Sequence, residues 1–147
     1  PPAAEAPPAA MPDAASGPGV TDPFGIGSAV GRLSGGARTK GHAAFMVLAC
    51  ALEPGEGAQL VVQCRYNGAA GAVALTDRRL LVVNAREWEP DVTTVDLEPG
   101  LTVKGWQDGN HAALVFERED DEVVVDRIAD SAVAQEIAAA VRGRSGG

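Results

Sequence analysis

The stretch LEPGEGAQLVVQCRYNGAAGAVALTDRRLLVVN, residues 52–84, decides the fold of this 147-residue chain. A Pro-Gly-Glu lead-in precedes two apolar runs, and the Asn-Gly pair between them can adopt the positive φ angles of a tight hairpin turn. A Thr-Asp-Arg-Arg corner at 76–79 then introduces a third apolar run. Short apolar runs separated by turn residues predict an antiparallel sheet.

The same spacing of apolar runs and turns continues toward the C-terminus. Pro99-Gly100 suits a type II turn, and Asp108-Gly109-Asn110 suits another hairpin. Leu114 and Phe116 alternate with Val115 and Glu117, which predicts one buried and one exposed face. We predict seven strands: Ala58 to Arg65, Ala70 to Thr76, Arg79 to Asn84, Val92 to Leu97, Leu101 to Gln107, Ala112 to Arg118 and Glu122 to Asp126.

Helices are expected on both sides of the strands. The upstream run HAAFMVLACAL predicts three helical turns that stop at Glu53-Pro54-Gly55, although so short a run also fits a strand. Downstream, Asp130 or Ser131 can cap a helix whose apolar residues recur at three and four, and Gly143 can end it. Docking of this amphipathic helix over an open sheet predicts a partly open barrel with a helical cap.

LEPGE, the small-residue hairpin at 68–71 and the run ALTDRRLLVVN, followed by further strands and a capping helix, resemble the bacterial pleckstrin-homology-like domains, relatives of the GRAM domain. The resemblance covers about residues 44–142. It implies a mainly β fold, a seven-stranded antiparallel partly open barrel capped by a C-terminal α-helix, with a short N-terminal helix. It also implies binding of proteins, peptides or lipids, or assembly, without a family-wide catalytic residue.

Residues 1–39 are dominated by Pro, Ala, Gly and Ser, so we expect a disordered tail or linker there and the folded domain over 40–147. Phe24 and Ile26 are the bulky apolar pair of this segment; they either dock on the domain or form a short binding motif. The start at Pro1, without a signal-like segment, is typical of a fragment or a processed product.

The folded part holds the whole excess of negative charge. Residues 41–147 carry seventeen acids against nine bases, because residues 1–40 hold three of each out of 20 and 12. Such a surface repels phosphate backbones, so nucleic acid is not an expected partner. The resemblance implies that phosphoinositide binding depends on several bases in the first hairpin, and that loop offers only Arg65 here, so this ligand is not expected either. Two cysteines, too few for a disulfide framework, favour a reduced compartment and a cytoplasmic location.

Arginines and a tryptophan provide the candidate interaction site. Arg78 and Arg79 are adjacent bases that suit a carboxylate-bearing or phosphorylated partner, or else satisfy Asp77 and neighbouring acids at a turn. Trp88, in a loop, is a candidate interface anchor, whereas Trp106, inside a predicted strand, is expected in the core. The predicted interaction patch comprises Arg65, Arg78, Arg79, Arg86 and Trp88.

No cofactor or metal is expected. The acidic run at 117–122 lacks the glycine and the spaced oxygen ligands of a calcium loop, and the cysteines and histidines lack the short paired spacings of a zinc site. The stretch GIGSAVG lacks the preceding strand that a dinucleotide-binding loop requires. Neither a nucleophile elbow nor an oriented base is recognisable, so an enzyme is not predicted.

These observations predict a non-catalytic binding or assembly module of bacterial pleckstrin-homology-like type. Its partner is expected to be a protein or a second copy of the chain, bound in an open groove or along a sheet edge. Two alternatives are a peripheral membrane or lipid-sensing module, with weakly supported membrane contact, and a small-ligand-binding barrel or enzyme.

Overall fold

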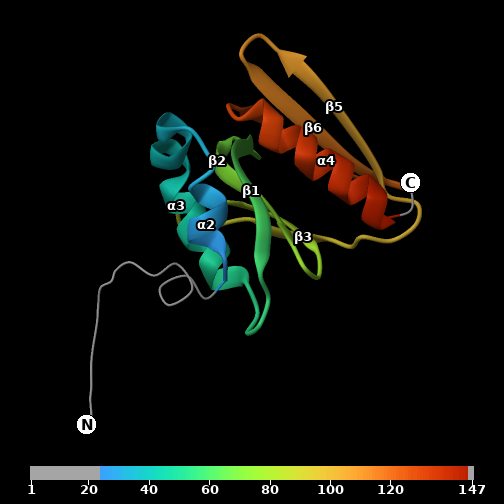
Figure 1. Ribbon diagram of the computed structural model, residues 1–147, viewed down its shortest axis with the longest axis horizontal. Coiled ribbons are helices and arrows are strands. Elements are labelled where there is room, and N and C mark those ends of the chain that lie inside the picture. The colour runs from blue at the N-terminus through green and yellow to red at the C-terminus, as the bar shows by residue number, and fades with distance from the viewer. Residues whose placement is uncertain (1–23, 146–147) are drawn as a thin grey trace.

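The computed structural model describes residues 24–145, which form a seven-stranded antiparallel sheet and three helices (Figure 1). Helices α2 (Ile26–Val30) and α3 (Gly35–Ala51) precede the strands, and α4 (Ser131–Ser145) follows them. All seven predicted strands are confirmed, each end lying within two residues of its predicted position. They are β1 (Ala58–Tyr66), β2 (Ala69–Thr76), β3 (Leu80–Asn84), β4 (Val92–Val95), β5 (Thr102–Asp108), β6 (His111–Arg118) and β7 (Asp121–Ile128).

The strand order is β4-β3-β2-β1-β7-β6-β5. Sequential neighbours pair antiparallel except β4 and β5, and β1 joins β7 at the pair Arg65 and Asp126. The sheet therefore has a four-stranded half, β1 to β4, and a three-stranded half, β5 to β7, which meet where β1 pairs with β7. The two edge strands are β4 and β5. A seven-strand meander closed by a C-terminal helix is the pleckstrin-homology-like arrangement implied by the sequence resemblance, so that prediction is confirmed.

Helix α4 packs against β1, β5 and β6 and buries Val133, Ile137 and Val141. Each such side chain stabilises the fold by about 1.5–3 kcal/mol through burial. Gly143 does not end the helix as predicted. The last turn continues to Ser145, and Arg144 Nη1 donates to the carbonyl of Thr76 at 2.6 Å, which holds this turn against the end of β2.

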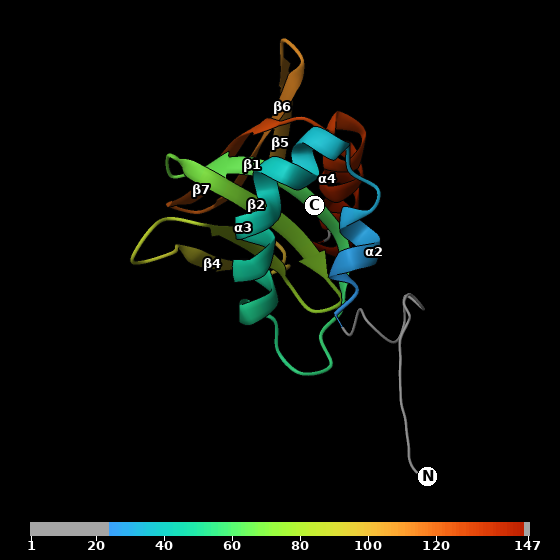
Figure 2. The same ribbon diagram turned by 90° about the vertical axis from the view of Figure 1, so that its left-hand side faces the viewer.

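Helix α3 covers the opposite face of the first half of the sheet, across β1, β2 and β3 (Figure 2). Its buried residues recur at helical spacing: Ala37, Gly41, Ala44, Phe45 and Leu48. A Cβ on Gly41 would lie 2.7 Å from Phe45 Cζ, so glycine lets the ring pack down on the helix. Helix α3 covers one face of β3, and all five residues of this strand are buried, so it reads as a continuous apolar run without alternation.

The N-terminal helical region is longer than predicted. Residues 26–30 and 35–39, which the composition assigned to the disordered tail, are helical, while the rest of that predicted tail, residues 1–23, lies outside the described residues. Ala29 on α2, Leu33 in the turn that follows and Ala37 on α3 are all buried in the core. Phe24 and Ile26 pack against the same core, which favours docking over a free motif. None of the described helices has the length and apolar character needed to cross a membrane.

Candidate functional site

The two sequence motifs that carry the family resemblance meet in space as an ion-pair cluster. The Glu56 side chain, from LEPGE, is 0% exposed, and its Oε1 and Oε2 atoms accept hydrogen bonds from Arg79 Nη2 at 2.8 Å and Nε at 2.9 Å. Thr76 Oγ1 adds a bond of 2.7 Å to Oε2, and the Glu53 amide adds one of 3.0 Å to Oε1. Arg79 also donates to the carbonyl of Ala51. This cluster joins the end of α3 to the β2–β3 corner.

Charge and hydrogen bonding fix the ionisation of this cluster. The hydrogen bonds from Arg79 lower the pKa of Glu56 from 4.5 to about 2, against the opposing effect of burial. The same contact raises the pKa of Arg79. The Arg79 side chain is only 19% exposed, and its donors are engaged by three residues, Glu56, Thr94 and Ala51. Its observed role is therefore to hold the corner together.

Arg78 also makes local contacts. Its Nη1 lies 3.4 Å from Glu53 Oε1, and its Nη2 donates to the carbonyl of Pro54 at 3.4 Å. The Asp77 carboxylate accepts from the Gly57 amide at 2.8 Å. These contacts agree with the alternative that the two arginines satisfy acids at a turn.

Arg86 and Trp88 lie on the loop between β3 and β4, at the other end of these strands. Buried Asn84 anchors this loop, since its Nδ2 donates to the Tyr66 carbonyl at 2.9 Å and to Asp91 Oδ2 at 2.8 Å. Its Oδ1 accepts from the Asp91 amide at 2.8 Å. The hydrogen bond from Asn84 is the main cause of the lowered pKa of Asp91. Arg86 Nη1 lies 3.2 Å from the same carboxylate, and Trp88 is 100% exposed.

The five predicted patch residues therefore do not converge. Leu75 faces Leu80 across β2 and β3, which places Arg78 and Arg79 at one end of the sheet. Arg65 faces Ala70 at the other end, on the side of the β3–β4 loop. These residues do not form a single positive patch, because consecutive turns of an antiparallel sheet lie at opposite ends of its strands.

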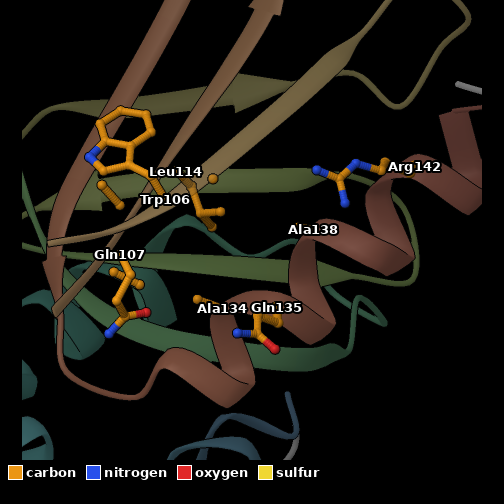
Figure 3. Close-up of a pocket in the computed structure, with 10 residues that line it drawn as sticks. Trp106, Gln107, Leu114, Ala134, Gln135, Ala138 and Arg142 are labelled. Atoms are coloured by element: carbon orange, nitrogen blue, oxygen red, sulfur yellow. The ribbon is translucent and has the colours of Figure 1, made fainter. Parts of the chain in front are cut away.

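A groove that sequence reasoning did not identify lies between α4 and the β5–β6 hairpin (Figure 3). Its volume is about 260 Å³. Figure 3 shows Trp106 and Gln107 on its strand side and Gln135 and Arg142 on its helix side. The space exists because small residues line both walls: Gly105, Ala112 and Ala113 on the strands, with Ala134 and Ala138 on the helix.

The outer edge of β5 borders this groove and carries free backbone groups. Arg142 Nη2 donates to the Val103 carbonyl at 2.9 Å, so this carbonyl points away from β6. In an antiparallel strand the N–H and C=O of one residue point to the same side, and this side alternates along the chain. Gly105 and Gln107 therefore also direct their backbone groups away from β6. Among the described strands β5 pairs only with β6, so this edge is open.

Trp106 is not a core residue, which corrects the sequence prediction. Its side chain is 50% exposed, while Val103 is buried. The two residues are three apart in the strand, and side chains at odd separations point to opposite faces. Trp106 faces outward opposite Ala113 on β6, a position that its sequence environment does not reveal.

Groups capable of metal or thiol chemistry are dispersed. Residues 24–145 contain no group of three or more His, Cys, Asp or Glu side chains placed to hold a metal ion. Cys64 is buried, and burial raises the pKa of its thiol, whereas Cys50 is exposed. The acidic turn at 117–122 forms the β6–β7 hairpin, with Glu117 3.1 Å from Lys104.

Comparisons with known proteins give a limited result. No family model matches the chain, and no curated protein matches it. The solved structures include a pleckstrin homology domain from Shewanella amazonensis SB2B that is similar over 65% of this chain and 92% of that chain, with 14% sequence identity and a TM-score of 0.47. A similarity of this size carries no functional argument. The fold class rests on the strand order and the helical cap described above.

Proposed function

We propose that this protein is a non-catalytic binding module whose β5 edge and adjacent groove bind an extended segment of a protein partner. The observation that carries this proposal is the open β5 edge beside a groove with small-residue walls. An extended peptide added to such an edge gains main-chain hydrogen bonds for affinity, while a side-chain pocket supplies selectivity.

The dimensions of the site support a short peptide. The outward backbone N–H and C=O groups of Gly105 and Gln107 can form hydrogen bonds with one added strand segment. At the far end, the Val103 carbonyl already accepts a hydrogen bond from Arg142. The groove of about 260 Å³ is slightly smaller than the usual ligand pocket, which suits one anchoring side chain of the partner.

The test is a selection of phage-displayed random linear peptides on the full chain, followed by titration of the selected peptides against two variants. Gln135→Trp places a large ring over the groove from an exposed helix position and should abolish binding. Ala139→Trp is the matched control, because this exposed α4 residue does not line the groove, and it should bind normally.

A second variant probes the edge itself. Gln107→Pro removes an outward N–H without removing a donor to β6, so it should weaken peptide binding by about 10-fold, the value of one hydrogen bond. Failure to select any linear peptide, or equal binding by Gln135→Trp and Ala139→Trp, would refute the proposed site.

A further inference from the structure

A second cavity, of about 530 Å³, lies where α3, the β1–β2 hairpin and the end of β7 meet. Its walls combine small apolar side chains with positive charge. The alanines are Ala37 on α3, Ala69 and Ala70 on β2, and Ala129 just after β7. The cations are Lys40, Arg65 and Arg127. No local sequence pattern links Lys40, Arg65 and Arg127, because they come from three different elements, α3, β1 and β7.

Within the described residues, the cations of this cavity make no ion pair and no side-chain hydrogen bond. All twelve Lys and Arg residues of the chain lie in residues 24–145, and eight of them donate to a carboxylate, a carbonyl or another side-chain oxygen. The four that make no such contact are Arg38, Lys40, Arg65 and Arg127, and three of these line the one cavity. In a chain with net charge −8, this concentration of unpaired cations indicates a site for a negatively charged group.

The acids nearest this cavity, Asp130 and Asp126, are not ion-paired with its cations. Asp130 Oδ1 accepts from the Ser34 amide at 3.0 Å at the start of α3. Asp126 on β7 lies opposite Arg65 on β1 but forms no ion pair with it. Arg127 has a φ of 56°, a left-handed backbone that costs about 1–3 kcal/mol in a non-glycine residue. The end of β7 therefore keeps a strained conformation beside the cavity.

The chain also carries a group of complementary chemistry, the segment Glu87-Trp88-Glu89, which we call the acidic tip. Trp88 is fully exposed between two exposed glutamates, and its φ of 72° is again left-handed. The hydrogen bonds of Asn84 and Asp91 at the base of the loop hold the tip in this form. A large aromatic side chain held in solvent at an energetic cost is typical of an interface anchor.

We propose that the cavity binds the acidic tip of a second copy of this chain. The alanine walls suit an indole ring, and the rim cations suit the two flanking carboxylates. Inorganic phosphate would satisfy the cations but leave the apolar walls exposed. Each copy carries both halves of the contact, which permits either a reciprocal dimer or a head-to-tail series. This surface is separate from the β5–α4 groove.

The test is sedimentation velocity of the full chain over a range of concentrations at low salt, expecting reversible association that weakens as ionic strength rises. Trp88→Ala should weaken association at least about 10-fold, as expected for a hot-spot tryptophan, while Trp106→Ala should not. Lys40→Glu should act like Trp88→Ala. Arg38→Glu is its matched control, because Arg38 lies on the same helix, is also unpaired, and does not line the cavity.

Mixing separates a specific contact from general loss of folding. Trp88→Ala retains the cavity and Lys40→Glu retains the tip, so the two monomeric variants should form a heterodimer when mixed. A wild-type chain that stays monomeric at every concentration, or variants that fail to complement, would overturn the proposal. It would also be overturned if phosphate or anionic vesicles bound the cavity while the chain stayed monomeric. Each of these results would leave peptide binding at β5 unaffected.

Discussion

Replacement of Arg79 by methionine tests the role of the ion-pair cluster most directly. The variant keeps the aliphatic stem but leaves the Glu56 carboxylate buried without its cation. The change in the pKa of Glu56 from 4.5 to about 2 corresponds to about 3 kcal/mol of stabilisation. Solvent reaches the Arg79 side chain, which is 19% exposed, and screening reduces this contribution to about 2 kcal/mol. We therefore expect Arg79→Met to lose about 2–3 kcal/mol of unfolding free energy at neutral pH.

The pH dependence identifies the mechanism. In the wild type the folded-state pKa of Glu56 is depressed, so its contribution is complete above pH 4.5 and is lost as the pH falls toward 2. Without Arg79, burial dominates and raises the folded-state pKa, so the variant gains stability relative to the wild type as Glu56 takes up a proton. The difference in stability between the two proteins should therefore shrink between neutral pH and about pH 4.

Urea denaturation followed by tryptophan fluorescence at the two pH values measures both effects. The control is Glu56→Gln combined with Arg79→Met, which removes both charges and should be less destabilised than Arg79→Met at neutral pH. A loss below about 1 kcal/mol, or a loss that is the same at both pH values, would refute the assignment of a buried, charged Glu56.

Three further outcomes are expected. Gly71→Ala should destabilise the fold by about 1–3 kcal/mol in thermal unfolding, because a Cβ there would lie 2.7 Å from a carbonyl of β3. The control Gly36→Ala, on α3 with open space at its Cβ, should be neutral or stabilising. Equal effects of the two substitutions would contradict the packing. Asn84→Ala should lose about 2–3 kcal/mol because it strands buried backbone groups, and unchanged denaturation would contradict the anchored loop. A thiol reagent should label Cys50 at once and Cys64 only after unfolding, and immediate labelling of both would show an open core.

The strands were predictable because their signals are local. Alternating or continuous apolar runs and turn pairs such as Asn67-Gly68 act within a few residues, so strand ends were placed to within two residues. The short helix α2 was not predicted, because glycines surround Ile26 and Ala29 and weaken the local helical signal. The helix forms because the folded sheet offers these side chains a surface on which to pack.

The candidate sites were much less predictable. The predicted patch grouped four arginines and Trp88 by residue type, and the strand order places them at opposite ends of the sheet. The orientation of Trp106 depends on which face of a three-stranded half meets α4, and this is not encoded in its neighbours. The groove and the cationic cavity are formed by residues of several elements, so each becomes visible only when those elements are assembled.

The sequence by itself determined the order of strands and turns, the helical cap and the excess of negative charge, because these depend on periodicity, turn chemistry and composition. The tertiary structure alone decided which charges are neutralised. It buried Glu56 against Arg79 and left Lys40, Arg65 and Arg127 together without a partner. The physical reason is that electrostatic and packing interactions depend on distance in space, and chain folding sets that distance independently of separation in sequence.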